Sequence, residues 1–231
     1  MELAVSVESR QIWRRLAWLA VYASAMGLLE AICVIYLRRL CPVETNYPIP
    51  PLERMQIEII REACTIVMLA AVAWLAGINL RSRLACFFCA FGVWDILYYI
   101  GLAWLAGWPK SVLDWDCLFL IPKPWYGPVL VPVLISFYFV AGCWFLHLRE
   151  LRNAPLRLSG PELALQLLGF LVWYWSFVKD AERISSHGYA GIRYAWEWFA
   201  VGLILGVVGL WLAGRSRPTT IAASPHPTRP P

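Results

Sequence analysis

The chain has 231 residues, of which 60% are hydrophobic and only 15% are charged. Ordinary soluble domains carry about 25% charged residues, so this composition excludes that class and indicates an integral membrane protein. The net charge of +5 is small, and the basic residues flank apolar segments instead of clustering among aromatic residues. Nucleic acid is therefore not an expected partner.

Six apolar segments follow one another along the chain, each near the roughly 20 residues that a helix needs to cross the hydrocarbon core. Their runs are continuously apolar, whereas the strands of a membrane barrel alternate with period two. The fifth segment is short and contains Gln166. The sequence predicts an all-α, polytopic membrane protein with a bundle of six transmembrane helices. The predicted helices are 16–37, 57–77, 84–105, 129–148, 163–178 and 194–213.

Local signals also mark the ends of the membrane domain. Ser159 followed three residues later by Glu162, with Pro161 between them, is typical of a capping box and predicts where the fifth helix begins. From residue 215 the chain is rich in Pro, Ser and Thr and has no periodicity. We therefore expect one transmembrane domain over residues 1–214 and a disordered cytoplasmic tail over residues 215–231.

The distribution of Lys and Arg predicts the orientation. The N-terminus, the second and fourth loops and the C-terminal tail, which share one side of the membrane, carry eleven basic residues. The first, third and fifth loops, on the other side, carry eight. Because cytoplasmic segments carry the excess of basic residues, both termini are expected to be cytoplasmic. The flanking cations also favour contact with anionic membrane lipids.

Three acidic residues lie well inside the predicted spans, away from their ends. At about 1.5 Å of rise per residue, Glu30 lies roughly 10 Å and Glu62 roughly 7 to 8 Å below the outer surface. Asp95 lies about 16 Å from the inner end of the third helix, near the midplane. An ionisable group at such a depth is costly and indicates a functional site. Asp95, Glu62 and Glu30 are therefore the candidate catalytic residues.

Helical spacing adds candidate binding residues around these acids. Arg61 lies three residues after Glu58 and can pair with it. Asp95, Tyr98 and Tyr99 stand at i, i+3 and i+4 and form one stripe that rises toward the outer surface. Basic and polar groups near that surface complete the site. The candidate substrate-binding residues are Arg61, Tyr98, Tyr99, Asp114, Asp116 and Lys179.

The connection between the third and fourth helices is rich in Trp and Pro. Its apolar run at residues 118–122 is too short to cross the bilayer, and its four prolines prevent a regular helix. We expect a re-entrant or interfacial loop that covers the bundle, because irregular backbone at depth must be shielded by protein. Asp114 and Asp116 flank Trp115, so an extended backbone would point both carboxylates the same way.

The motifs of this region carry a resemblance. The string at residues 91–99, Phe-Gly-Val-Trp-Asp-Ile-Leu-Tyr-Tyr, is followed by Trp108-Pro109, the Asp-Trp-Asp motif at 114–116 and the Leu-Phe-Leu-Ile-Pro motif at 118–122. Over about the first 135 residues the chain resembles a group of bacterial multi-pass membrane proteins of uncharacterised activity. The resemblance implies the bacterial inner membrane as the location, and it implies no activity, cofactor or site residue.

The sequence gives little support for a cofactor or metal. The three histidines are scattered, which argues against a His-rich zinc or haem site. No cofactor and no metal are expected, although carboxylates alone would favour Mg, Ca or Mn over zinc.

Seven cysteines are present, and two pairs attract attention. Cys86 and Cys89 form a C-x-x-C motif inside the third helix, where we interpret them as packing residues, with redox chemistry as the alternative. Cys41 and Cys117 are predicted in loops on the outer side, where oxidising conditions would allow a disulfide between them.

Three classes of function remain open at this point. In an enzyme for a lipid-linked or amphipathic substrate, Asp95 or Glu62 would transfer a proton and Arg61 or Lys179 would hold an anionic head group. In a small transporter, Glu30, Glu62 and Asp95 would carry protons or cations. In a non-catalytic subunit or assembly factor, the loop would dock a membrane-protein partner or a second copy of the chain. The charges could also form only a packing network.

Overall fold

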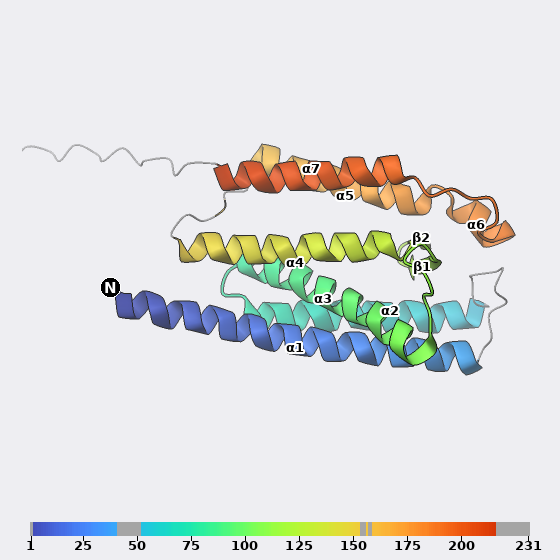
Figure 1. Ribbon diagram of the computed structural model, residues 1–231, viewed down its shortest axis with the longest axis horizontal. Coiled ribbons are helices and arrows are strands. Elements are labelled where there is room, and N and C mark those ends of the chain that lie inside the picture. The colour runs from blue at the N-terminus through green and yellow to red at the C-terminus, as the bar shows by residue number, and fades with distance from the viewer. Residues whose placement is uncertain (1, 41–51, 153–155, 157–158, 216–231) are drawn as a thin grey trace, which may run out of the picture.

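The computed structural model describes residues 2–40, 52–152, 156 and 159–215 (Figure 1). In this part of the chain, seven helices and one two-stranded hairpin follow each other. Of the predicted tail at 215–231, Arg215 is the last residue of a helix, and residues 216–231 lie outside the described residues, as does Cys41.

Six of the helices are long and apolar enough to cross a membrane, which confirms a multi-pass membrane protein. The seventh, α6, is a short helix that follows α5 directly. The fifth span, which is short in the sequence prediction, extends to His187 when α6 is included. The helices are α1 (Glu2–Leu40), α2 (Leu52–Ala76), α3 (Leu80–Ala106), α4 (Leu130–Leu151), α5 (Gly160–Val178), α6 (Ala181–His187) and α7 (Trp196–Arg215).

Two helices begin at a capping box. At α5 the predicted box is present, with the Ser159 N–H donating to Glu162 Oε2 at 3.0 Å. At α3 the sequence prediction missed a second box, in which the Ser82 N–H donates to Asn79 Oδ1 at 2.9 Å. Because these side chains satisfy N–H groups that have no partner within the helix, α3 begins at Leu80 rather than at residue 84.

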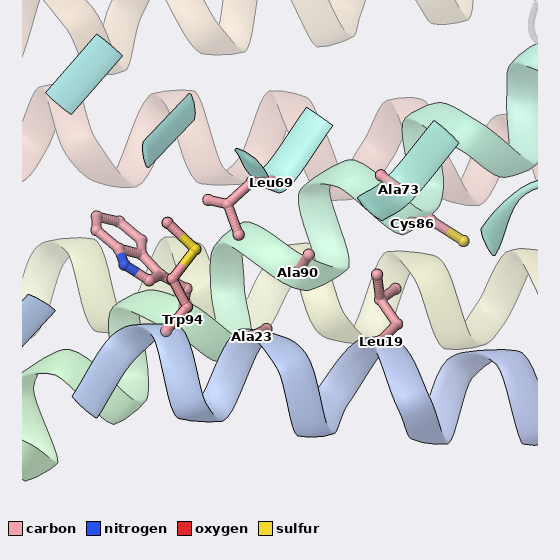
Figure 2. Close-up of a cluster of buried hydrophobic side chains, with 8 residues drawn as sticks. Leu19, Ala23, Leu69, Ala73, Cys86, Ala90 and Trp94 are labelled. Carbon is pink, nitrogen blue, oxygen red and sulfur yellow. The ribbon is translucent and has the colours of Figure 1, made fainter. Parts of the chain in front are cut away.

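Helix α3 lies at the centre of one half of the molecule and packs against α1, α2 and α4 (Figure 1). Figure 2 shows the contact of α1, α2 and α3, where Ala23, Ala73 and Ala90 face one another beside Leu19 and Leu69. Small side chains let helix backbones approach closely, and in a membrane this packing replaces the hydrophobic effect as the source of association. The resulting closeness brings polar groups of three helices within reach of each other.

A glycine marks the tightest contact between α3 and α4. A Cβ atom added at Gly92 would lie 2.6 Å from the carbonyl oxygen of Ser136. The two backbones therefore meet at a point where no larger residue fits. This contact lies one turn from Asp95, and it fixes the distance between that residue and α4.

Helices α5 and α7 form a second layer on the other side of α4 (Figure 1). Their close approach depends on Gly169, where an added Cβ would lie 2.9 Å from the carbonyl oxygen of Gly202. Gln166 joins three helices, since its Oε1 accepts from the Tyr138 hydroxyl and its Nε2 donates to the Gly206 carbonyl, both at 2.8 Å. The one amide in the fifth span is therefore satisfied by packing partners.

The connection between α3 and α4 contains an antiparallel hairpin, β1 (Trp115–Phe119) and β2 (Trp125–Pro128), at the end of the bundle opposite the N-terminus (Figure 1). The helical bundle is as predicted, and this hairpin is an addition that the sequence analysis did not predict, in which two short segments flanking the prolines pair with each other. Val129 N–H donates to the Asp114 carbonyl at 3.0 Å and extends the pairing to the start of α4. Entry of this segment into the membrane stays a prediction.

The glycine contact gives a stability test. Gly92→Ala should lower the free energy of unfolding in detergent by about 1–3 kcal/mol, because the backbone oxygen of Ser136 must move away from the new methyl group. The control is Gly142→Ala, whose Cβ would meet only Leu210 Cδ2 at 3.7 Å. This control should gain up to about 1 kcal/mol from helix propensity. Equal effects of the two changes in a thermal or chemical unfolding measurement would contradict the close contact.

Candidate functional site

A cavity of about 40 Å³ lies at the hairpin end of the bundle, enclosed by α1, α2, α3 and β1. A volume of this size holds one or two water molecules. Polar side chains from three helices line it, and six of them are candidates from the sequence. These residues are Glu30, Arg61, Glu62, Thr65, Asp95, Tyr98 and Tyr99.

Arg61 is shared between two carboxylates. Its Nη2 lies 2.6 Å and its Nε 2.9 Å from Glu58 Oε2, which confirms the pairing predicted from their spacing on α2. Its Nη1 forms an ion pair with Glu30 of α1. Glu30 also accepts from the Thr65 hydroxyl at 3.3 Å. A single guanidinium thus joins α1 to α2, and its charge is divided between two acids.

The Glu62 side chain contacts the hairpin and takes no part in the ion pairs of Arg61. Its Oε2 accepts the backbone N–H of Leu120 at 2.9 Å, just after the end of β1. Both Glu62 and Leu120 are buried. This carboxylate therefore satisfies a backbone donor that the short hairpin leaves unpaired, and it fastens the hairpin to α2.

Asp95 is buried where α3 meets α4. Its Oδ2 accepts from the Ser136 hydroxyl at 2.9 Å, and Ser136 itself is fully buried. In the described part of the chain, this hydroxyl is the one hydrogen-bond partner found for the Asp95 carboxylate. No described cation pairs with Asp95, so its neighbours alone do not neutralise a negative charge at this depth.

Asp116 connects the cavity with the exposed end of α1. Its Oδ2 accepts from the Tyr99 hydroxyl at 3.1 Å, and its Oδ1 lies 3.5 Å from Arg38 Nη2. The Arg38 guanidinium also stacks over the Trp108 ring, 4.3 Å from its centre. Burial raises the pKa of Asp116, and Arg38 and the Tyr99 hydrogen bond oppose this rise only in part. Asp116 therefore favours its protonated form more than an exposed aspartate does.

Negative charge exceeds positive charge in this cluster of residues. We call it the acidic cluster and define it by its members, which are Glu30, Arg38, Glu58, Arg61, Glu62, Asp95 and Asp116. Five carboxylates meet two guanidinium groups, so full ionisation would leave three negative charges uncompensated by these residues. Such an excess in a buried environment favours the uptake of protons or of a cation.

Two other candidates from the sequence, Asp114 and Lys179, do not line the cavity. Asp114 lies before β1 and accepts the backbone N–H groups of Lys110 and Ser111 at 2.7 and 3.1 Å, so it does not point with Asp116. Lys179 pairs with Asp180 at 2.7 Å, at the junction of α5 and α6. Cys117 lines the cavity, and its disulfide with Cys41 stays a prediction.

The sequence analysis missed three residues that belong to the acidic cluster or form hydrogen bonds with its members. Thr65 and Ser136 are the single Ser or Thr residues of two apolar helices, and Arg38 directly follows the first predicted span. A buried hydroxyl in an otherwise apolar face is a signal that could have found Ser136, because such a group needs a partner. In the part of the chain that the structure describes, no group of three or more His, Cys, Asp or Glu side chains is arranged to hold a metal ion.

No family model, no curated protein and no solved structure matches this chain. Its function is therefore argued from the geometry of the acidic cluster.

The shared ion pair yields a test of stability. Arg61→Gln should lower the free energy of unfolding by about 3 kcal/mol or more, because it leaves the buried Glu30 without its cation. Adding Glu30→Gln should restore part of that loss, since no unpaired charge then remains. The exposed Arg10→Gln is the control and should change stability by less than about 0.5 kcal/mol. Additive effects of Arg61→Gln and Glu30→Gln would argue against the pair.

Asp116 yields a test by pH. Its pKa is raised in the folded protein, so the folded state holds this proton at a pH where the unfolded chain has lost it. The contribution of Asp116 to stability should therefore fall as pH rises above about 4. The fall should level off above the folded-state pKa. The difference between the wild type and Asp116→Asn, measured by unfolding in detergent across that range, should show this fall, and a difference that grows with pH would contradict it.

Proposed function

We propose that this integral membrane protein is a small proton carrier, in which the acidic cluster binds and releases protons at the hairpin end. The observation that carries the proposal is Asp95, a buried carboxylate that borders a small cavity and has one neutral partner among the described residues. Acidic side chains at membrane depth are the usual proton sites of pumps and transporters.

The size of the cavity supports a proton over a larger ligand. Sites for drug-sized molecules have volumes of roughly 300 to 1,000 Å³, whereas this cavity has about 40 Å³. A lipid-linked or amphipathic substrate, which the sequence allows, would need a far larger opening. Water and protons fit the space as it is.

The charges support the same proposal. Glu62 and Asp95 are held by a backbone N–H and a hydroxyl, both neutral donors. A neutral partner does not cancel the charge of an ionised carboxylate, so a bound proton is the simplest way to balance the charge at these two positions. The carboxylates then hold exchangeable protons next to a space that can contain water.

A connected set of groups supplies the route for exchange. Arg38 is 41% exposed at its side chain, Asp116 contacts Arg38, and Tyr99 joins Asp116 to the cavity. Asp116 has a raised pKa because it is buried, which suits a group that takes up a proton and passes it on. In this proposal Asp116 relays protons between the surface and the cavity, and Asp95 holds them at the midplane.

Infrared difference spectroscopy tests the proton binding directly. The wild type should show carboxylic-acid C=O absorption at neutral pH that Asp95→Asn reduces, because Asp95 would carry one of the bound protons. The matched control is Asp180→Asn, which removes a carboxylate that pairs with Lys179 away from the cavity. This control should keep the band. A band that persists unchanged in Asp95→Asn would contradict the assignment of the proton to Asp95.

Proteoliposomes test the carrier function. A membrane potential should drive proton uptake, reported by a trapped pH-sensitive dye, for the wild type and Asp180→Asn but not for Asp95→Asn. The same vesicles with a trapped sodium-sensitive dye and an imposed sodium gradient test whether sodium, instead of the proton, is the transported ion. If the infrared band is present and no ion flux occurs, the carrier function is wrong although the acidic cluster binds protons.

A further inference from the structure

A second cluster of reactive side chains lies at the other end of the bundle, between α3 and α4. Cys86 and Cys89 belong to α3, and Cys143 and His147 belong to α4. Cys86, Cys143 and His147 are 1%, 3% and 4% exposed. We call these four residues the thiol cluster, and none of them belongs to the acidic cluster.

Helical spacing explains why these groups meet. Cys86 and Cys89 stand at i and i+3 on α3, and Cys143 and His147 stand at i and i+4 on α4, so each pair shares one face of its helix. Cys143 is seven residues beyond Ser136, two turns along the same face, and Cys89 is three residues before Gly92. Because α3 and α4 run in opposite directions (Figure 1), Cys86, six residues before Gly92, and Cys143, seven residues after Ser136, lie at a similar distance from the contact of Gly92 with Ser136.

The contacts within the thiol cluster cross from one helix to the other. The electrostatic interactions of Cys86 and of Cys89 both include the Cys143 thiol across the helix contact. His147 Nδ1 lies 2.9 Å from the Cys143 carbonyl oxygen and 3.6 Å from the Cys143 sulfur. Since a carbonyl oxygen only accepts, Nδ1 carries the proton and Nε2 is left as an acceptor. The imidazole also interacts with Cys86.

A small cavity adjoins His147. Its volume is about 30 Å³, and Arg15, Ser82 and Glu150 line it together with His147. This space suits a molecule of about the size of water or hydrogen peroxide. A small polar oxidant could thus come next to the imidazole without opening the bundle.

We propose that Cys86 and Cys143 are an oxidisable pair, which a peroxide converts into a disulfide that joins α3 to α4. His147 accepts the proton of Cys86, and the thiolate attacks one peroxide oxygen, which gives a sulfenic acid and releases water with the His147 proton. The Cys143 sulfur then attacks the sulfenic sulfur, and the second water leaves. Two thiols and one hydrogen peroxide become one disulfide and two water molecules, with two electrons passing from sulfur to oxygen.

The consequence is a covalent link between the helices that carry Asp95 and Ser136. The disulfide would restrict any movement of α3 against α4. Oxidant would therefore also affect the contact between Asp95 and Ser136. Cys89 interacts with Cys143 and His147 as well, but it is less buried than Cys86 and Cys143.

The test treats membranes that contain the full chain with hydrogen peroxide and then blocks the remaining thiols with N-ethylmaleimide. Trypsin cleaves after the exposed Lys110, which separates α3 from α4. The two fragments should stay together without reductant and separate with it, and mass analysis should find Cys86 bonded to Cys143. Free Cys86 and Cys143 should decrease in equal amounts.

Matched variants complete the test. Cys86→Ser and Cys143→Ser should each abolish the link, and Cys89→Ser and the exposed Cys64→Ser should keep it. Mass analysis of the wild type needs no variant, so a variant that fails to fold leaves the test intact. Fragments that separate without reductant, oxidation of Cys64 alone, or a link that survives Cys86→Ser would each overturn the proposal.

Discussion

The shortage of positive charge at the hairpin end is the constraint on which the rest of this molecule depends. Arg61 divides its charge between Glu30 and Glu58, and Arg38 serves Asp116 from a partly exposed position. The remaining carboxylates are held by neutral donors. A buried environment disfavours such an excess of charge, and this is why we propose that the folded protein binds protons here. The same protons are the cargo that we propose.

Packing and chemistry use the same contacts. Helix α3 can bring Asp95 to Ser136 only because Gly92 lets the two backbones meet. The hairpin covers the cavity only because Glu62 binds the Leu120 N–H. Residues that favour a close-packed bundle therefore also exclude all but small molecules from the site. A buried charge that adds little stability is understandable where it supplies a proton site.

Features that depend on neighbours along one helix could be predicted from the sequence, and features that depend on distant segments could not. The six apolar helices, the Ser159 capping box and the Glu58–Arg61 pair are local. The hairpin was missed because pairing of residues 115–119 with 125–128 depends on two short segments separated by prolines. Ser136 was missed because its partner is 41 residues away. Asp114 does not point the same way as Asp116, because its carboxylate accepts the backbone N–H of Lys110 in a turn just before β1.

The most direct measurement of the central claim is the number of protons that the protein releases when it unfolds at neutral pH. Comparing calorimetric unfolding in buffers with different ionisation enthalpies gives this number. Five carboxylates beside two guanidinium groups predict the release of up to three protons, and one fewer from a chain with asparagine at position 95. Unfolding that releases no proton would show that the buried acids are ionised and would contradict the account.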